Sequence, residues 1–190
     1  MFKEIANMKY ITILILILIV TLIQGCDNSV GPSSPKTTGE TTLTTQTDGY
    51  KFTGFSFSRG GNIVAPNAKK IVPDIRVHVQ TDPTGEIQGI ILSSGTQLFY
   101  PAFHPLKEFD DTDAAEEYFN NVNEAPDIYA DLAFFVKANQ VWAVKTNDDK
   151  YGIILILHTD AYEYTDDSNP APYGEVRFKW KYQPDGSKKF

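Results

Sequence analysis

Hydrophobic and polar residues alternate along much of the chain after Tyr50, and this alternation predicts β-strands. The clearest run is 175–182, where charged residues alternate with apolar and aromatic ones, so we expect a strand with one buried and one solvent-facing side. The run 153–157 is apolar at every position, which indicates a central strand covered on both faces.

Two turn sequences predict how these runs are joined. Pro83-Thr84-Gly85 separates the run 75–80 from the run 86–92, which is typical of a β-hairpin. A second hairpin is expected where residues 147–150 join the runs 140–145 and 151–157. Later, Gln183-Pro184-Asp185-Gly186 predicts a tight reversal, in which Gly186 takes a positive φ.

One short helix is predicted, between Asp113 and Val122. Asp113 would cap its N-terminus, and Glu116 three residues later completes a capping-box pattern. The asparagines from 120 onward are poor helix formers and should end it. We therefore predict an all-β fold: a single antiparallel, sandwich-like β domain with one short helix.

The N-terminal pattern is different, because it has no alternation. Lys3 and Lys9 precede an apolar stretch of 13 residues (11–23), which ends in Gln24-Gly25-Cys26. A charged start, a short apolar middle and a small residue before the cut are typical of a secretory signal peptide. The cysteine after the small residue resembles a bacterial lipobox, so residues 1–25 are predicted to be removed and Cys26 to carry diacylglycerol and palmitate-type acyl chains. The alternatives are an ordinary signal peptide with an incidental cysteine, or an uncleaved anchor.

Residues 26–49 are rich in Ser and Thr and poor in apolar side chains, so we expect a disordered tether followed by a domain at 50–190. Cys26 is the only cysteine, so no internal disulfide is expected. The predicted partner is the membrane, through the acyl chains. Asp27 resembles an inner-membrane retention signal in enteric bacteria, whereas in other lineages it is compatible with the outer membrane or cell surface. We expect a cell-envelope protein of the outer membrane.

Composition narrows the classes of function. Removing Lys3, Glu4 and Lys9 with the signal peptide moves the formal charge from −7 to −8. A net negative charge argues against nucleic acid as a partner, since binding phosphates requires a basic surface. The sequence lacks the motifs of nucleophile elbows, zinc proteases, P-loops and dinucleotide sites, and we expect no enzymatic activity.

Three stretches of the C-terminal half carry a family resemblance: FNNVNEAPDIY (119–129), VWAVKTNDDKYGIILIL (141–157) and GEVRFKWKYQPDGSKKF (174–190). They resemble the HmuY-like haem-binding lipoproteins, and GFSFSRGGNIV and PDIRVHV match the family more loosely. The family's T-x-D-G-K-Y hairpin has Asp149 here in place of glycine. Aspartate tolerates the left-handed region better than most residues, so the turn should survive. The resemblance implies an all-β domain behind a lipobox and a polar spacer.

The resemblance also implies haem, held by two axial side chains from loops, with delivery to a TonB-dependent haem receptor. Met1 and Met8 leave with the signal peptide, so a pair of methionines is excluded. The candidate ligands are His104, in a segment that its flanking prolines should keep irregular, and His158, at the end of the apolar strand. His78 is expected to be an ordinary strand residue. Candidate pocket walls are Tyr100, Phe103 and Tyr162.

These observations lead to an expected function with open alternatives. The leading expectation is haem capture for iron acquisition by a lipid-anchored envelope protein. The alternative is a non-enzymatic interaction or ligand-binding module of the same fold that does not bind haem. A weaker alternative is an adhesin or a subunit of an envelope complex.

Overall fold

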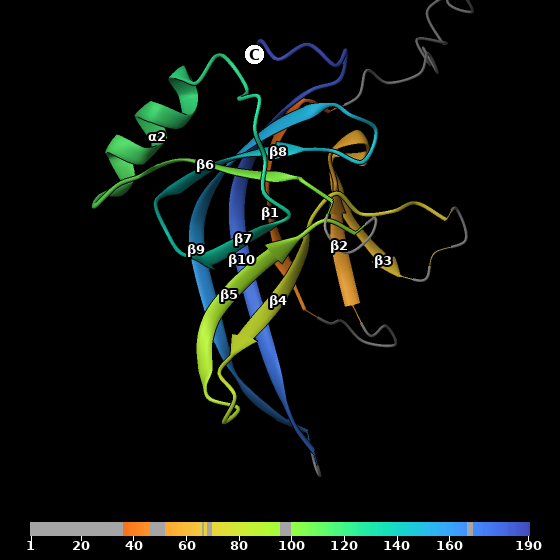
Figure 1. The fold of residues 1–190 in the computed structure, drawn as a ribbon, viewed down its shortest axis with the longest axis vertical. Helices are drawn as coiled ribbons and strands as arrows, with labels where there is room; N and C mark the ends of the chain where they lie inside the picture. The colour runs from red at the N-terminus through yellow and green to blue at the C-terminus, as the bar shows by residue number, and fades with distance from the viewer. Residues whose placement is uncertain (1–35, 46–51, 66, 68–69, 96–99, 167–168) are drawn as a thin grey trace, which may run out of the picture. The chain divides into compact units, whose positions relative to one another are not determined.

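The computed structural model describes residues 36–45, 52–65, 67, 70–95, 100–166 and 169–190, which belong to the compact unit Pro35–Phe190 (Figure 1). The predicted signal peptide and Cys26 lie outside the described residues. Within this unit, the predicted all-β fold with one short helix is confirmed. All the strand pairs are antiparallel.

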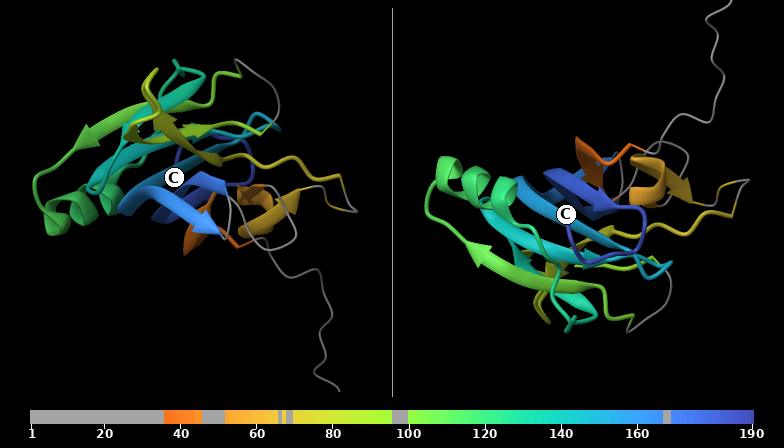
Figure 2. Two further views of the ribbon diagram at one scale, coloured as in Figure 1. Left: turned by 90° about the horizontal axis from the view of Figure 1, so that it is seen from below. Right: turned by 90° about the horizontal axis from the view of Figure 1, so that it is seen from above.

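Two layers of strands make the domain (Figures 1 and 2). A five-stranded sheet has the order β1-β10-β9-β8-β6. Its strands are β1 (Thr38–Thr44), β10 (Asn169–Gln183), β9 (Tyr151–Asp166), β8 (Gln140–Lys145) and β6 (Phe103–Glu108). A three-stranded sheet, β4-β5-β7, and the hairpin β2-β3 complete the fold. Their bounds are β4 (Arg76–Thr81), β5 (Ile87–Ser93), β7 (Leu132–Val136), β2 (Phe52–Ser56) and β3 (Gly61–Ala65), with the short 3-10 turn η1 (Phe57–Arg59) between the last two.

The main core lies between these layers and is rich in aromatic rings. The apolar residues of the run 175–182 point into it, with Phe178 0% and Trp180 1% exposed, as the alternation predicts. Phe55 meets Phe178 edge to face, with 5.3 Å between ring centroids. Such pairs add to the free energy gained from burying the rings. The central strand β9 sends Ile154 and Ile156 into this core.

A second, smaller core covers the opposite face of the five-stranded sheet. Ile153 and Leu155 of β9 pack there against Phe119 of the helix α2 (Thr112–Asn121), so β9 is buried on both faces as predicted. The predicted cap is wrong, because Asp111 and not Asp113 caps α2, through a 2.8 Å bond from the Ala114 N–H to its carboxylate. Glu116 does not complete a capping box but pairs with Lys179 of β10.

The domain begins earlier than the sequence predicts. The predicted disordered tether (26–49) is wrong for Thr38–Thr44, which form the edge strand β1 along β10. Threonine suits strands well, and Leu43 is fully buried in the main core. One apolar side chain and a complete ladder of backbone bonds were enough to order a segment whose composition is polar.

The long hairpin of β9 and β10 is a second correction. The sequence predicts that the apolar strand ends at His158 and that residues 160–174 form a loop, but β9 continues to Asp166 and pairs with β10 from Asn169. Pro172, which lacks a backbone donor, is tolerated because β1 has ended by that point and leaves β10 an open edge. The predicted turn conformations are confirmed, with φ of 58° at Asp149 and 80° at Gly186.

Candidate functional site

The structure places the two candidate haem ligands on strands rather than on loops. His104 belongs to the edge strand β6, where the proline at 105 lies at the sheet edge, and His158 belongs to the middle of β9. The predictions of an irregular segment at 104 and a strand end at 158 are therefore wrong. The apolar run ends at residue 157, and the residues beyond it are polar and aromatic, so the sequence pattern did not predict that β9 continues past His158.

The pairing register shows that the structure does not bring His104 and His158 together. His104 pairs with Ala143, and Ala143 pairs with Ile153, five positions before His158. Two strand spacings across the sheet and five residues along it separate the Cα atoms by about 15 to 20 Å. Two histidines on one iron need Cα atoms within roughly 13 Å, since each ring nitrogen must lie about 2 Å from the metal.

His104 has the better ligand geometry of the two. Its Nδ1 lies 2.8 Å from the carbonyl oxygen of Ile128. A carbonyl only accepts, so Nδ1 carries the proton and Nε2 keeps its lone pair in the neutral ring. A second hydrogen bond of this kind is what orients histidines that bind metals.

Aromatic rings surround this histidine on one side. The ring of Tyr129 lies 6.3 Å from that of His104 and 6.2 Å from that of Tyr151. The hydroxyl of Tyr129 is buried and, within the described part of the chain, has no hydrogen-bond partner. Burial raises the pKa of Tyr129, and the neighbouring Tyr151 and Asp127 raise it further. Ile128 is 77% exposed beside them.

The three candidate pocket residues do not share a pocket. Phe103 is fully buried in the main core. Tyr100 is half-buried and donates its hydroxyl to the carbonyl of Thr146 at 2.7 Å, which fixes it at the β8–β9 turn. Tyr162 is 43% exposed on the outer part of β9. Tyr100 packs against the same main core that contains Phe103, whereas Tyr162 lies apart from both on the outer hairpin.

The structure adds a feature that the sequence analysis missed, on the edge strand β7. Phe134 and Phe135 are 48% and 61% exposed, and Phe135 has a φ of 51°. Positive φ is rare for an aromatic residue and marks stored strain. It arises at a bulge, because the register with β5 shifts between Ile90 and Leu92. The adjacent phenylalanines in LAFFV were the available sign, since a regular strand directs one of two neighbours outward.

A buried amide holds this bulge in place. Gln140 accepts from the Trp142 indole and from the Lys137 backbone N–H, each at 3.1 Å, and donates to Glu108 at 3.0 Å. Lys137 and Glu108 also form an ion pair at 2.7 Å. These bonds tie the turn after β7 to β6 and β8, so the surrounding structure fixes the strained conformation of Phe135.

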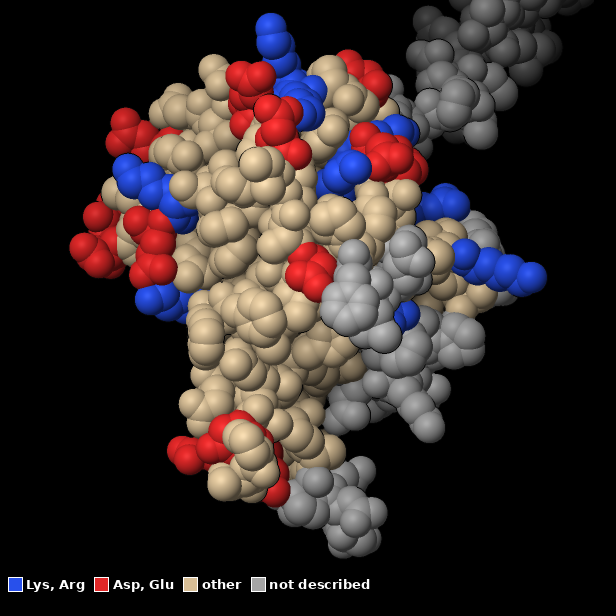
Figure 3. Space-filling view, in the orientation of Figure 1, with Lys and Arg blue, Asp and Glu red and all other residues tan. Residues whose placement is uncertain are grey.

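The middle of the face formed by β4, β5 and β7 has few charges. Figure 3 shows the side of the molecule where β4, β5 and β7 lie, and the charged side chains gather mainly over α2 and toward the ends of the view. His78 of β4 lies on this face, where its Nε2 is 2.7 Å from the Ser93 hydroxyl. Burial lowers the pKa of His78, and Arg76 lowers it further, so its ring is neutral at pH 7. This satisfied strand histidine agrees with its expected ordinary role.

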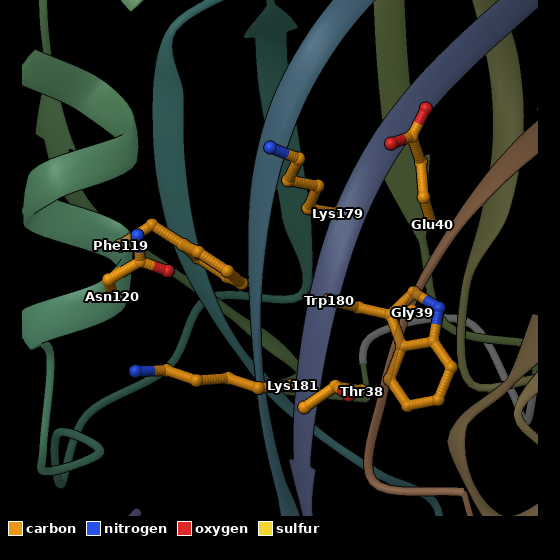
Figure 4. A pocket seen from close by; sticks show the side chains of 8 residues that line it. All are labelled: Thr38, Gly39, Glu40, Phe119, Asn120, Lys179, Trp180 and Lys181. Atoms are coloured by element: carbon orange, nitrogen blue, oxygen red, sulfur yellow. The ribbon is translucent and has the colours of Figure 1, made fainter. Parts of the chain in front are cut away.

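A cavity of about 290 Å³ lies between α2 and the β1–β10 edge (Figure 4). Figure 4 shows Phe119 pointing from α2 toward the strands and Lys181 extending from β10 toward α2. The Lys181 ammonium donates to the Val122 carbonyl and lies 5.3 Å from the Phe119 ring centroid. The Lys179 ammonium is 2.5 Å from Glu116. Because both cations already have partners, the cavity is best explained as the seam where the helix packs on the sheet.

The described residues include no helix that is both long and apolar enough to cross a bilayer. Within the same residues, no three His, Cys, Asp or Glu side chains gather as a metal site. Searches against family models, curated proteins and solved structures find no match to this chain. The likeness to HmuY-like proteins therefore stays a prediction from the motifs of the C-terminal half.

Proposed function

We propose that this chain is a non-enzymatic binding protein of the cell envelope, anchored by lipid at Cys26. The observation that carries the proposal is the exposure of aromatic side chains on strands, above all Phe135, whose strained conformation is held by the hydrogen bonds of the buried Gln140. A strained backbone at an exposed residue is typical of binding sites, where the strain holds a side chain in place for contact with another molecule.

Haem is the first ligand to test, and the arrangement supports one axial histidine rather than two. His104 has its Nδ1–H occupied by the Ile128 carbonyl, an apolar neighbour in Ile128 and a ring neighbour in Tyr129. Iron would add to the Nε2 lone pair, while His158 would take no part. In this proposal the envelope protein hands haem to a TonB-dependent receptor.

The test is a titration of the purified full chain with haemin, followed by the absorption spectrum. We expect a sharpened Soret band that is lost in His104→Ala and kept in His158→Ala. Equal loss in both variants would contradict single-histidine ligation. If the wild-type spectrum does not change in either redox state, haem capture is wrong and the binding module without haem remains.

That second candidate has its own supporting observation. The exposed rings of Phe134 and Phe135 lie 6.5 Å apart on an open sheet edge and need no cofactor to act as a contact surface. Anchoring is tested separately, because Cys26→Ala should release the protein from the membrane fraction under either ligand hypothesis.

A further inference from the structure

The outer half of the β9–β10 hairpin presents a ladder of side chains on one face of a two-stranded ribbon. Tyr162 pairs directly with Tyr173, and the next pair toward the core on the same face is Asp160 with Glu175. Side chains two residues apart share a face, so the four lie together on the same side of the ribbon. Tyr164 extends the row toward the tip of the hairpin.

The three tyrosines form a compact ring cluster in contact with solvent. The ring of Tyr173 lies 5.0 Å from that of Tyr162 and 6.2 Å from that of Tyr164. Tyr162 and Tyr164 remain 43% and 44% exposed. Contacts between the rings stabilise the ribbon, but Tyr162 and Tyr164 still leave much of their ring surface open to a partner.

The carboxylate pair beside the rings places two like charges opposite each other on adjacent strands. Like charges directly opposite each other on adjacent strands repel. Within the described part of the chain, neither Asp160 nor Glu175 forms an ion pair, and the nearest arginine on the same face, Arg177, lies 3.8 Å from Glu40 instead. The Glu175 carboxylate lies close enough to Tyr173 to raise the pKa of its hydroxyl, after the larger effect of burial.

We propose that this surface, formed by Tyr162, Tyr164, Tyr173, Asp160 and Glu175, binds a lysine or arginine side chain of a partner protein. A cation placed over the tyrosine faces gains cation–π attraction. The same cation also relieves the repulsion between the two carboxylates, because successive pairs on one face lie only about 7 Å apart. Negative charge at the base of an aromatic platform is complementary to a basic peptide and repels an acidic one.

The test measures the affinity of the full chain for a capped hexa-arginine peptide, with a capped hexaglutamine peptide of the same length as its control. Asp160→Asn and Glu175→Gln should each weaken binding of the arginine peptide about two- to five-fold, the effect of losing one partially exposed charge contact. Tyr162→Leu should weaken it by a similar factor, whereas Tyr162→Phe keeps the ring and the affinity.

Glu163→Gln is the matched control, because it removes the same charge from the same strand. Glu163 pairs with Pro172 and lies on the opposite face of the ribbon. Affinity for the arginine peptide should therefore stay within two-fold of wild type. Equal weakening in Glu163→Gln and Asp160→Asn would show attraction to net charge alone and overturn the proposal. Comparable binding of hexaglutamine, or no binding of hexa-arginine, would also overturn it.

A stability measurement separates this role from a structural one. If Asp160 and Glu175 are kept for binding, removing either charge relieves repulsion and raises the melting temperature by roughly 1–3 °C while affinity falls. A lower melting temperature in both variants would show that the pair supports the fold, and would contradict the assignment.

Discussion

Along the β9–β10 hairpin, the inner half has Phe178 and Trp180 at 0% and 1% exposure, whereas the outer half has Tyr162 and Tyr164 at 43% and 44%. Both halves belong to one pair of strands, and both are rich in rings. The inner half is enclosed by the three-stranded sheet and the β2–β3 hairpin on one face and by α2 on the other. The outer half is a ribbon whose tyrosine-bearing face meets solvent.

The difference separates two uses of aromatic residues. In the inner half, Phe178 and Trp180 contact Phe55, and these contacts bind the two layers of the fold together. In the outer half, the tyrosines contact mainly one another, and their polar ends suit a surface. The inner half therefore holds the two layers together, and the outer half carries the surface that we propose for recognition.

The largest expected effect comes from removing one ring from each half. Phe178→Ala should lower the free energy of unfolding by about 3–5 kcal/mol, because it leaves a cavity in the main core. Tyr164→Ala should change it by less than about 0.5 kcal/mol, as is usual for exposed positions. Urea denaturation of the two variants measures both values. Similar losses in both would mean that the outer half is also part of the folding core.

The sequence predicted the strands with many buried side chains better than those with few. The alternating run 175–182 and the apolar run 153–157 were interpreted correctly, because burial on one or two faces leaves a direct hydrophobic pattern. The strand Thr38–Thr44 was missed because it contributes one buried apolar side chain, Leu43, and otherwise backbone hydrogen bonds. Backbone hydrogen bonds can form whatever the side chain is, so the composition of a segment does not predict them.

The candidate sites were harder to predict for a different reason. His104 and His158 each had a plausible local sequence, but their separation depends on strand order and register, which no local pattern contains. The bulge at Phe135 depends on Gln140 and Glu108, which are distant from each other in the sequence. A site assembled from several strands therefore cannot be located until the strand order and register are known.

Asp74, just before β4, is almost fully buried near the start of β9, and its titration gives the second prediction. Its carboxylate accepts the backbone N–H of Phe57 at 2.9 Å and that of Asn147 at 3.0 Å. Burial raises the pKa of Asp74 from 3.8 to about 6. The folded state thus binds this proton more tightly than the unfolded state. The stabilisation from this group is complete below pH 3.8 and is lost as the pH rises through 6.

We therefore expect Asp74 alone to lower the free energy of unfolding by about 2 kcal/mol between pH 4 and pH 7. The measurement is urea denaturation across this range for wild type and for Asp74→Asn, which cannot titrate. Other carboxylates contribute equally to both proteins, so the difference in slope isolates Asp74. Identical slopes would contradict the raised pKa.

The smallest effect comes from adding one methyl group to each half of the hairpin. A Cβ at Gly152, in the inner half, would lie 2.4 Å from Cε1 of Phe57, whose ring is held by Trp180 and stacks on Tyr182. Gly152→Ala should therefore cost about 1–3 kcal/mol. A Cβ at Gly174 would meet the end of the Ile90 side chain at 2.7 Å and a methyl group of Val79 at 2.9 Å. The end of Ile90 can rotate away and Val79 must shift slightly, so Gly174→Ala should cost less than Gly152→Ala, about 1 kcal/mol. Thermal denaturation compares the two variants. A larger loss at Gly174 would mean that the rigid part of the core reaches further along the hairpin than the buried rings indicate.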